Sequence, residues 1–592
     1  MIRWKGNDPW GFLLGGASVL LLAAAGMQYV AVKTTCAIAG VAPKALSPFD
    51  YLGLWVTGWP GVRDGAVGFD LLHWIILALL LTVAVAATWV AVVLLRRRGK
   101  NPEHLLGLAS ISDVVKHAGR RQLMKRASAL RPSLPFPKAD DVGFLIATFR
   151  GTEVWVSVED PMILVGPSRS GKGFYFIVKM IVRSAGAVVT TSCKVDNVKL
   201  TMEARATEGR PVHVFAPGVD AAKGLGHELR WDPIVGCEDE EILKRRMSGL
   251  VPKDSFGGGT TNGGHWDTLG RQIATALFHA AALGGKTVDE VWGWVVNVSH
   301  ANEALEIIRG DARGISEHAD RLAMVLQAPA EKRATEWATV ATVLSYLDSR
   351  SVRAWLKPAP GMQFDIPRFL LNRGTLFMVG NEDGSGGYQQ VVGALMEEID
   401  HVADGLAAAM PGSRIDPPVS FILDEAANFH IQMLPKLISA GGGAGKQVLA
   451  VFQSRSQMSA WGPAVERAMW DAASIKIVLP GGSDEQDLRG LSNLIGESPE
   501  ARESYSSSAS GASTSWSEQE TAILTASAIR TMPKGTALVF HREMKPIVGR
   551  LASWLEMKEA AGMKAAEKAL SASLRDQSAY SALVAEHQSK TR

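Results

Sequence analysis

Two long apolar stretches lie near the start of the chain, and shorter apolar runs alternate with amphipathic segments after them. Residues 10–32 and 71–95 contain no Asp, Glu, Lys or Arg. At about 1.5 Å per residue, a helix of either length can cross a hydrocarbon layer of roughly 30 Å. We therefore predict two transmembrane helices, at about residues 10–32 and 71–95.

The charges beside these stretches predict their orientation. Basic residues follow the second stretch directly: Arg96, Arg97, Arg98 and Lys100. Because positive residues stay on the cytoplasmic side, the main body and both termini are expected in the cytoplasm, with residues 33–70 as a short external loop. A secretory signal peptide is the rival interpretation of the first stretch, but its apolar core would be shorter, roughly 7 to 15 residues.

Beyond residue 140, short runs rich in Val, Ile and Phe are separated by helical patterns. Such runs are typical of buried strands in a mostly parallel sheet that helices cover on both faces. We predict strands at residues 162–165, 187–191, 212–215, 375–379, 419–423, 447–452, 474–479 and 537–540. The predicted fold class is therefore α/β.

Between the strands near residues 215 and 375 the pattern changes to helix. Apolar residues recur at helical spacing in two places: Trp266, Leu269, Ile273 and Leu277, and then Trp337, Val340, Leu344 and Leu347. Thr287 followed by Glu290 is a capping-box signature that predicts a helix start. We predict an all-helical subdomain inserted into the sheet domain. A Gly-rich hinge at 256–264 precedes it, and a mobile Ser-rich excursion at 504–517 follows later.

Composition narrows the function only slightly. The 592 residues are enough for more than one domain. The 62 Lys and Arg nearly balance the 59 Asp and Glu, which excludes a broad basic coat for binding nucleic acid. Basic residues are concentrated at 116–131, where anionic headgroups or DNA would suit them. The three cysteines show no metal-ligand spacing.

A phosphate-binding loop of the G-x-x-x-x-G-K type follows the strand predicted at 162–165. Its residues are Gly166, Pro167, Ser168, Arg169, Ser170, Gly171, Lys172 and Gly173. In such a loop backbone N–H groups surround an anion, the glycines allow close approach, and Lys172 neutralises the outer phosphates. The alternative is a glycine-rich turn that only opens a helix.

The strand predicted at 419–423 ends in two carboxylates. We predict that Asp424 is the magnesium partner and that Glu425 is the base that orients and deprotonates the attacking water. Gln453 ends the strand predicted at 447–452 and is placed to sense the γ-phosphate or that water. The alternatives are solvated carboxylates and a hydrogen-bonded loop glutamine. Both motifs lie at strand ends, where open α/β sheets bind ligands. Together they predict a nucleotide-hydrolysing motor with Lys172, Asp424, Glu425 and Gln453 as catalytic residues.

One position departs from the usual loop. The residue after the lysine is Gly173, where a Ser or Thr hydroxyl would normally coordinate magnesium. Magnesium keeps several waters and often uses only one or two protein carboxylates, so Asp424 with phosphates and waters can still hold it. We predict weaker metal binding rather than an inactive site.

On these residues the chain resembles the TraG-type coupling proteins of type IV secretion, within the FtsK and HerA motor superfamily. The resemblance is carried by residues 166–173, by Leu-Asp-Glu-Ala-Ala-Asn at 423–428, by Leu434-Pro435, by Gln-Ser-x-Ser-Gln at 453–457 and by Trp461-Gly462. It extends from the first apolar stretch to about residue 554. Gly173 is also found in many loops of that family, whereas residues 190–196 lack the acidic pattern expected there.

The resemblance implies a RecA-like domain that uses ATP and Mg2+, in a homo-hexameric ring at the bacterial inner membrane. The implied function is an ATPase that couples a DNA–relaxase complex, or protein effectors, to a type IV secretion channel. The implied partners are single-stranded DNA with its relaxase, channel components and membrane lipid. An FtsK-like double-stranded DNA translocase is the alternative, although a basic DNA-reading module after the motor is not evident. A membrane scaffold that binds nucleotide without hydrolysing it is the third possibility.

These patterns divide the chain into successive segments. We predict a transmembrane anchor at 1–98, a basic membrane-proximal linker at 99–140, the nucleotide-binding domain at 141–264 and 358–556, the helical insertion at 265–357, and a helical or disordered tail at 557–592.

Overall fold

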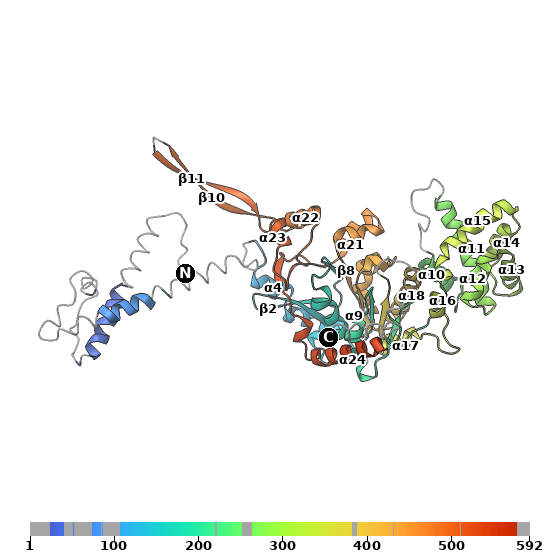
Figure 1. Ribbon diagram of the computed structural model, residues 1–592, viewed down its shortest axis with the longest axis horizontal. Helices are drawn as coiled ribbons and strands as arrows, with labels where there is room; N and C mark the ends of the chain where they lie inside the picture. The colour runs from blue at the N-terminus through green and yellow to red at the C-terminus, as the bar shows by residue number, and fades with distance from the viewer. Residues whose placement is uncertain are drawn as a thin grey trace, which may run out of the picture. The chain divides into compact units, whose positions relative to one another are not determined.

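The computed structural model describes residues 24–38, 40, 51, 74–83, 86, 107–219, 222–251, 263–381, 387–429, 431–508 and 511–576. Its ribbon is shown in Figure 1. The chain forms two compact units, Met1–His104 and Leu105–Arg592.

In the first unit, residues 24–38 and 74–83 are helical. None of the helices in the described part of the chain has the length and apolar character needed to cross a membrane. The predicted spans at 10–32 and 71–95 lie largely outside the described residues, because 10–23, 71–73, 84–85 and 87–95 are not among them. The transmembrane anchor therefore stays a prediction.

An 11-stranded sheet forms the centre of the second unit, in the order β2-β1-β13-β12-β9-β3-β8-β7-β4-β6-β5. From β9 to β5 neighbouring strands are parallel, and from β2 to β9 they are antiparallel. The strands are β1 (Gly143–Phe149), β2 (Thr152–Ser157), β3 (Met162–Val165), β4 (Val188–Ser192), β5 (Val212–Phe215), β6 (Thr375–Val379), β7 (Val419–Leu423), β8 (Lys446–Phe452), β9 (Ile475–Val478), β12 (Thr536–His541) and β13 (Ile547–Arg550). The α/β class with a mostly parallel sheet is confirmed.

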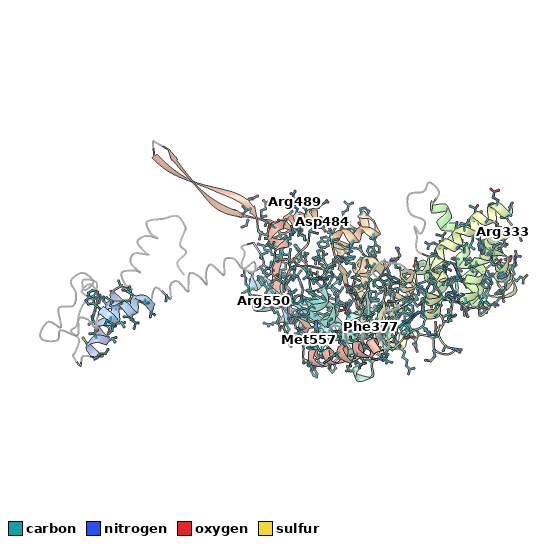
Figure 2. The ribbon with its side chains drawn as sticks, in the orientation of Figure 1. Arg333, Phe377, Asp484, Arg489, Arg550 and Met557 are labelled. Carbon is teal, nitrogen blue, oxygen red and sulfur yellow. The ribbon has the colours of Figure 1, made fainter. Side chains whose placement is uncertain are left out.

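Core side chains pack on both faces of this sheet. In β3, Ile163 belongs to one buried cluster, whereas its neighbours Met162 and Leu164 belong to the other. This alternation follows from the two-residue period of a strand, and it explains why the parallel strands are apolar throughout. Figure 2 shows Phe377 of β6 inside the body and Arg489 at its surface.

The other helices of this unit, outside the segment between β5 and β6, include α8 (Val178–Arg183), α9 (Asp196–Arg205), α18 (Tyr388–Ala408), α20 (Leu434–Ala440), α21 (Pro463–Ala472), α22 (Glu485–Ile495), α23 (Ala526–Arg530) and α24 (Ala560–Asp576). A short π-helix, η3 (Gly173–Ile177), connects the phosphate loop to α8.

Between β5 and β6 the described residues form helices and no strand. These are α10 (Glu240–Leu250), α11 (Gly263–Leu283), α12 (Val288–Val296), α13 (Ala301–Gly310), α14 (Ser316–Leu326), α15 (Ala330–Val343), α16 (Arg350–Trp355) and α17 (Ile366–Leu371). The capping box is present, because the Thr287 backbone N–H donates to Glu290 Oε2 at 2.7 Å. Helices α11 to α15 pack on one another, as Figure 1 shows.

Within the segment predicted as a basic membrane-proximal linker, residues 111–142 form α4 (Ile111–His117), α5 (Arg120–Met124), α6 (Ala127–Leu130) and α7 (Ala139–Val142). Their apolar residues, such as Val114 and Leu130, are buried against the sheet, and Arg131 Nε donates to Asp416 Oδ1 at 2.6 Å. In place of the Ser-rich excursion there is a two-stranded ribbon, β10 (Glu497–Ser508) with β11 (Gly511–Ala522), which projects beside α22 and α23 (Figure 1).

Candidate functional site

The order of strands brings the sequence motifs to one edge of the sheet. Strand β8 lies between β3 and β7, with Val165 opposite Phe452 and Leu423 opposite Ala450. These strands are parallel, so the residues that follow their carboxyl ends lie together. The phosphate loop follows β3, Gln453 follows β8, and Asp424 follows β7. Segments that are more than 250 residues apart in the sequence therefore share one site.

The backbone of the phosphate loop is tightly curved. Gly171 has a φ of +95°, and a Cβ atom there would lie 2.6 Å from the ring of Tyr175, so no side chain fits. Arg169 is exposed and has a left-handed φ of +62°. Lys172 Nζ folds back over the loop and donates to the carbonyl oxygens of Gly166 at 2.8 Å and Pro167 at 3.1 Å. The loop thus has the enclosed shape that an anion site requires.

Contacts from β4 and the turn after it hold the backbone of Asp424 and the carboxylate of Glu425. Thr191 Oγ1 donates to the carbonyl oxygen of Asp424 at 2.8 Å, and the Cys193 N–H donates to Glu425 Oε2 at 3.2 Å. Glu425 itself has a left-handed φ of +51°. A non-glycine residue in that region is uncommon and is maintained by surrounding contacts, which often marks functional positions.

Burial perturbs the charges of this site. Burial and the neighbouring Glu425 raise the pKa of Asp424 to about 7, although Lys172 opposes the shift. Burial also lowers the pKa of Lys172 below its ordinary value, against the pull of Asp424 and Glu425. Removal of water thus outweighs the attraction between Lys172 and Asp424. A bound polyanion beside Lys172 and a bound cation beside Asp424 would stabilise the charged forms of these two side chains.

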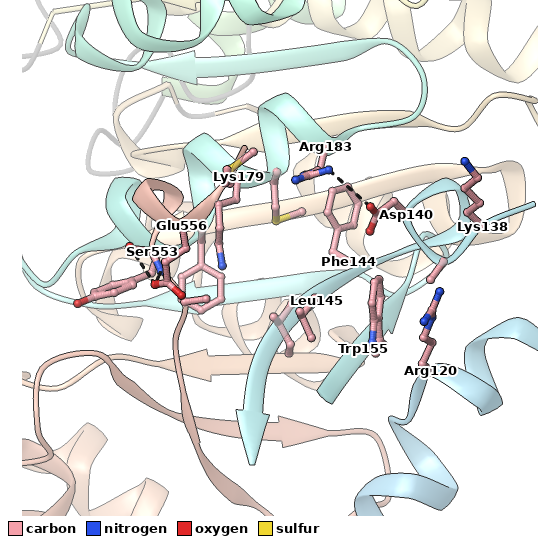
Figure 3. Close-up of a pocket in the computed structure, with 17 residues that line it drawn as sticks. Arg120, Lys138, Asp140, Phe144, Leu145, Trp155, Lys179, Arg183, Ser553 and Glu556 are labelled. Carbon is pink, nitrogen blue, oxygen red and sulfur yellow. Dashed lines mark hydrogen bonds and ion pairs between the residues drawn. The ribbon is translucent and has the colours of Figure 1, made fainter. Parts of the chain in front are cut away.

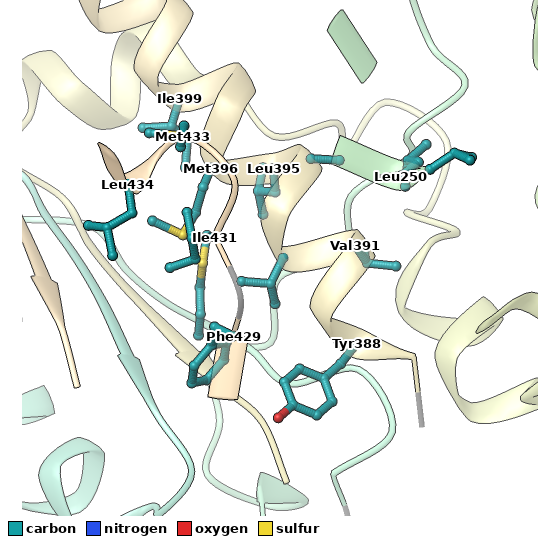
Figure 4. Close-up of a cluster of buried hydrophobic side chains, with 14 of the residues drawn as sticks. Leu250, Tyr388, Val391, Leu395, Met396, Ile399, Phe429, Ile431, Met433 and Leu434 are labelled. Carbon is teal, nitrogen blue, oxygen red and sulfur yellow. The ribbon is translucent and has the colours of Figure 1, made fainter. Parts of the chain in front are cut away.

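A further set of contacts positions the segment after Glu425. Gln389 Nε2 of α18 donates to the Asn428 carbonyl oxygen at 2.6 Å, and the rings of Tyr388 and Phe429 meet edge to face at 5.5 Å. Figure 4 shows apolar side chains of α18 packed against Phe429, Ile431 and Leu434. The sequence motifs did not reveal this support, because α18 lies before β7 in the chain and its sequence has only an ordinary helical pattern.

The residues that follow β8 are held within the chain. The Gln453 N–H donates to Gln457 Oε1 at 2.8 Å. Arg455 lies 3.3 Å from Glu466 and 5.0 Å from the Trp470 ring centre. Its guanidinium is therefore engaged inside its own subunit.

A separate cavity of about 430 Å³ lies beside α8, between β1 and residues 552–557 (Figure 3). Its walls are mainly aromatic and aliphatic, with Arg120, Lys138 and Lys179 among the cations. Burial lowers the pKa of Lys179 to about 8. None of the predicted site residues lines this cavity.

The loop and the carboxylates fit a nucleotide with its magnesium ion. Within the described part of the chain, Ser170 Oγ is buried and has no hydrogen-bond partner, so a polar ligand at the loop would satisfy it. Lys172 supplies a cation, and Asp424 and Glu425 supply hard oxygen donors, which magnesium prefers.

Comparison with known proteins agrees with this geometry. Residues 418–534 match the family model described as "TraM recognition site of TraD and TraG". The fold is similar to the bacterial conjugative coupling protein TrwBdeltaN70 in its unbound form, at 17% identity and a TM-score of 0.50, over 70% of this chain and 88% of that chain. Its complex with sulphate gives 17% identity and a TM-score of 0.50, over 67% and 86%. The comparison with curated proteins gives no match.

Fold and site together define an α/β protein in which a glycine-rich loop and two carboxylates lie at the same sheet edge. Within that class, residues 418–534 match the TraD and TraG family, and the fold is that of a conjugative coupling protein. The resemblance to TraG-type coupling proteins is confirmed.

Proposed function

We propose that this protein is a membrane-anchored ATPase that couples a DNA–relaxase complex, or protein effectors, to a type IV secretion channel. ATP hydrolysis powers the transfer. The observation that carries the proposal is the convergence of the phosphate loop with Asp424 and Glu425 on one sheet edge, beside a segment that matches the TraD and TraG family. The coupling role named for TrwBdeltaN70 and the TraM recognition named for TraD and TraG support the cargo and the relaxosome partner.

The anchor, the ring and the location belong to the same proposal. The two apolar stretches at 10–32 and 71–95 support a multi-pass protein of the bacterial inner membrane with both termini in the cytoplasm. A homo-hexamer suits a motor that moves a polymer, because subunits around a pore can share the work. Single-stranded DNA, channel components and membrane lipid are the proposed partners.

The chemistry follows from the positions of the side chains. Residues Gly166 to Gly173 bind the triphosphate, and Lys172 Nζ exchanges its two loop carbonyls for phosphate oxygens. Asp424 holds Mg2+, which when bound neutralises charge on the β- and γ-phosphates. Glu425 accepts a proton from the attacking water, and the Cys193 N–H fixes the orientation of its carboxylate. Gln453, at the end of β8, orients the water or senses the γ-phosphate.

The experiment measures phosphate release by the full chain in detergent micelles, with and without single- or double-stranded DNA. Glu425→Gln is expected to lower turnover at least about 100-fold while ATP binding remains. Lys172→Ala is expected to weaken both, and Lys568→Ala, an exposed lysine of α24, to weaken neither. Turnover by the unmodified chain no faster than that of Glu425→Gln would contradict the proposal and favour the nucleotide-binding scaffold. Stimulation by double-stranded DNA alone would favour the FtsK-like translocase.

A further inference from the structure

The place left by the missing loop hydroxyl is next to one side chain. A Cβ atom added to Gly173 would lie 3.4 Å from Asn197 Oδ1. Apart from the chain neighbours Lys172 and Phe174 and the backbone of the same helix, no other heavy atom of the described residues lies within 4 Å of that point. Space for a Ser or Thr side chain is therefore available at residue 173, and the carboxamide of Asn197 borders it.

Asn197 is the second residue of α9, which follows β4 and the turn after it. In β4, Thr191 Oγ1 donates to the backbone carbonyl of Asp424, and in the turn the Cys193 N–H donates to the carboxylate of Glu425. Helix α9 packs against α8, and this keeps Asn197 beside the phosphate loop. Its backbone carbonyl accepts from Thr201 Oγ1 at 2.7 Å, whereas its half-buried carboxamide has no hydrogen-bond partner within the described residues.

We infer that Asn197 Oδ1 replaces the missing loop hydroxyl as an oxygen ligand for the nucleotide-bound Mg2+, directly or through one water. The inference rests on the proposed function, which places ATP at the loop. Neighbouring oxygens around an octahedral Mg2+ with bonds of about 2.1 Å lie about 3 Å apart. An oxygen 3.4 Å from the would-be Cβ of residue 173 is therefore close enough to enter the coordination shell that the absent hydroxyl would join.

A neutral carboxamide suits this position better than another carboxylate. Asp424 and Glu425 already repel each other in a buried setting. A third negative charge beside this pair would add repulsion that a neutral side chain does not. Asn197 adds a hard oxygen without that penalty, as the loop hydroxyl does in other proteins. The loop thus lacks a metal-binding oxygen at Gly173, and Asn197 of the neighbouring helix α9 supplies one instead.

The test measures binding of N-methylanthraniloyl-ATP to the full chain in detergent, in EDTA and in a Mg2+ titration. In EDTA the unmodified chain, Asn197→Ala and Asn493→Ala, an exposed asparagine of α22, are expected to bind the analogue equally. With Mg2+, Asn197→Ala should lose about tenfold of the metal-dependent gain in affinity, and Asn493→Ala should lose none. The double variant Gly173→Ser with Asn197→Ala should recover most of the gain.

Each other outcome has one meaning. An unchanged Mg2+ gain in Asn197→Ala would overturn the inference. A loss of the gain that Gly173→Ser does not restore would also overturn the inference. A serine hydroxyl at residue 173 can replace a missing metal ligand, but it cannot replace a structural role of the Asn197 side chain. If the unmodified chain bound no analogue in either buffer, the proposed function would fail instead.

Discussion

At the scale of single residues, the carboxylate pair depends on neighbours that come from a distant strand. Thr191 Oγ1 and the Cys193 N–H reach Asp424 and Glu425 across more than 230 positions of sequence. The left-handed backbone conformation at Glu425 costs on the order of 1–3 kcal/mol. The contacts from Thr191 and Cys193 offset this strain. Thr191 and Cys193 can therefore control the geometry of the proposed base, Glu425.

Thr191→Val removes one such contact and keeps the shape of the side chain. The buried carbonyl of Asp424 then lacks this donor, which costs about 1–3 kcal/mol of folding free energy. We expect kcat to fall about tenfold with little change in KM for ATP, because the base and metal partner shift while the phosphate loop does not.

Thr275→Val is the matched control. Its hydroxyl also donates to a backbone carbonyl, at 2.7 Å, but to Arg271 within α11 rather than to Asp424. Both variants should lower the melting temperature, and only Thr191→Val should lower kcat. Equal kcat values would show that the contact to Asp424 does not position the site.

The sequence predicts the candidate site residues that lie together at the sheet edge better than the groups that position them. Lys172, Asp424 and Glu425 stand in local patterns whose spacing reflects their chemistry. Thr191, Cys193 and Gln389 lie in segments without such spacing, and their contacts arise only when β4 and α18 pack beside β7. A single sequence carries no signal for those contacts, because pairing of distant strands is a property of the whole sheet.

At the scale of elements, helix α18 carries a largely buried carboxyl group, that of Glu397, whose charged form burial destabilises. Burial, with Asp400 next, raises the pKa of Glu397 to about 7, while Lys436 and Arg245 oppose the shift. The folded state then holds a proton between about pH 4.5 and 7 that the unfolded chain has lost. This contribution to stability is full below about pH 4.5 and disappears as the pH rises through 7.

Glu397→Gln should remove that pH dependence. The amide stays neutral, so the variant should melt at a higher temperature than the unmodified chain at pH 8, with a smaller difference at pH 5.5. Thermal melting of both proteins at these two values checks the sign. Glu331→Gln, an exposed site near the start of α15, should shift neither curve. A larger gain at pH 5.5 than at pH 8 would contradict the assignment.

Strands in the parallel part of the sheet were predictable, and β1, β2 and β13 at its antiparallel end were not. Strands β3, β5, β6 and β7 have the predicted bounds, because each is a short run of mostly apolar residues. Strands β1, β2 and β13 include polar or glycine positions such as Glu153 and Gly549, and they pair antiparallel at one end of the sheet. The ribbon of β10 and β11 consists largely of Ser, Thr and Glu, which composition alone assigns to a loop.

At the scale of the whole molecule, the boundary between the two units predicts a separable anchor. The second unit begins at Leu105 and contains the complete sheet. A chain of residues 105–592 should therefore fractionate with the soluble proteins, whereas the full chain sediments with the membranes. Full-length Lys172→Ala should remain in the membrane fraction, because it changes the site and not the anchor. Membrane retention of residues 105–592 would place the anchoring surface in the second unit.

A ring of cooperating subunits makes a quantitative prediction about mixed assemblies. Arg455 is held by Glu466 and Trp470 of its own chain, so another cation would have to compensate the phosphate charge at a neighbouring subunit's site. Arg169, which is exposed on the phosphate loop, is the candidate for that cation. If all six subunits of a hexamer must turn over, an equal mixture with Glu425→Gln keeps about 2% of full activity, whereas independent subunits keep about half. Phosphate release across mixing ratios, with Lys568→Ala as the neutral partner, distinguishes these curves. A linear decline of phosphate release with the fraction of Glu425→Gln would mean that each site works alone, and it would contradict cooperation between the subunits.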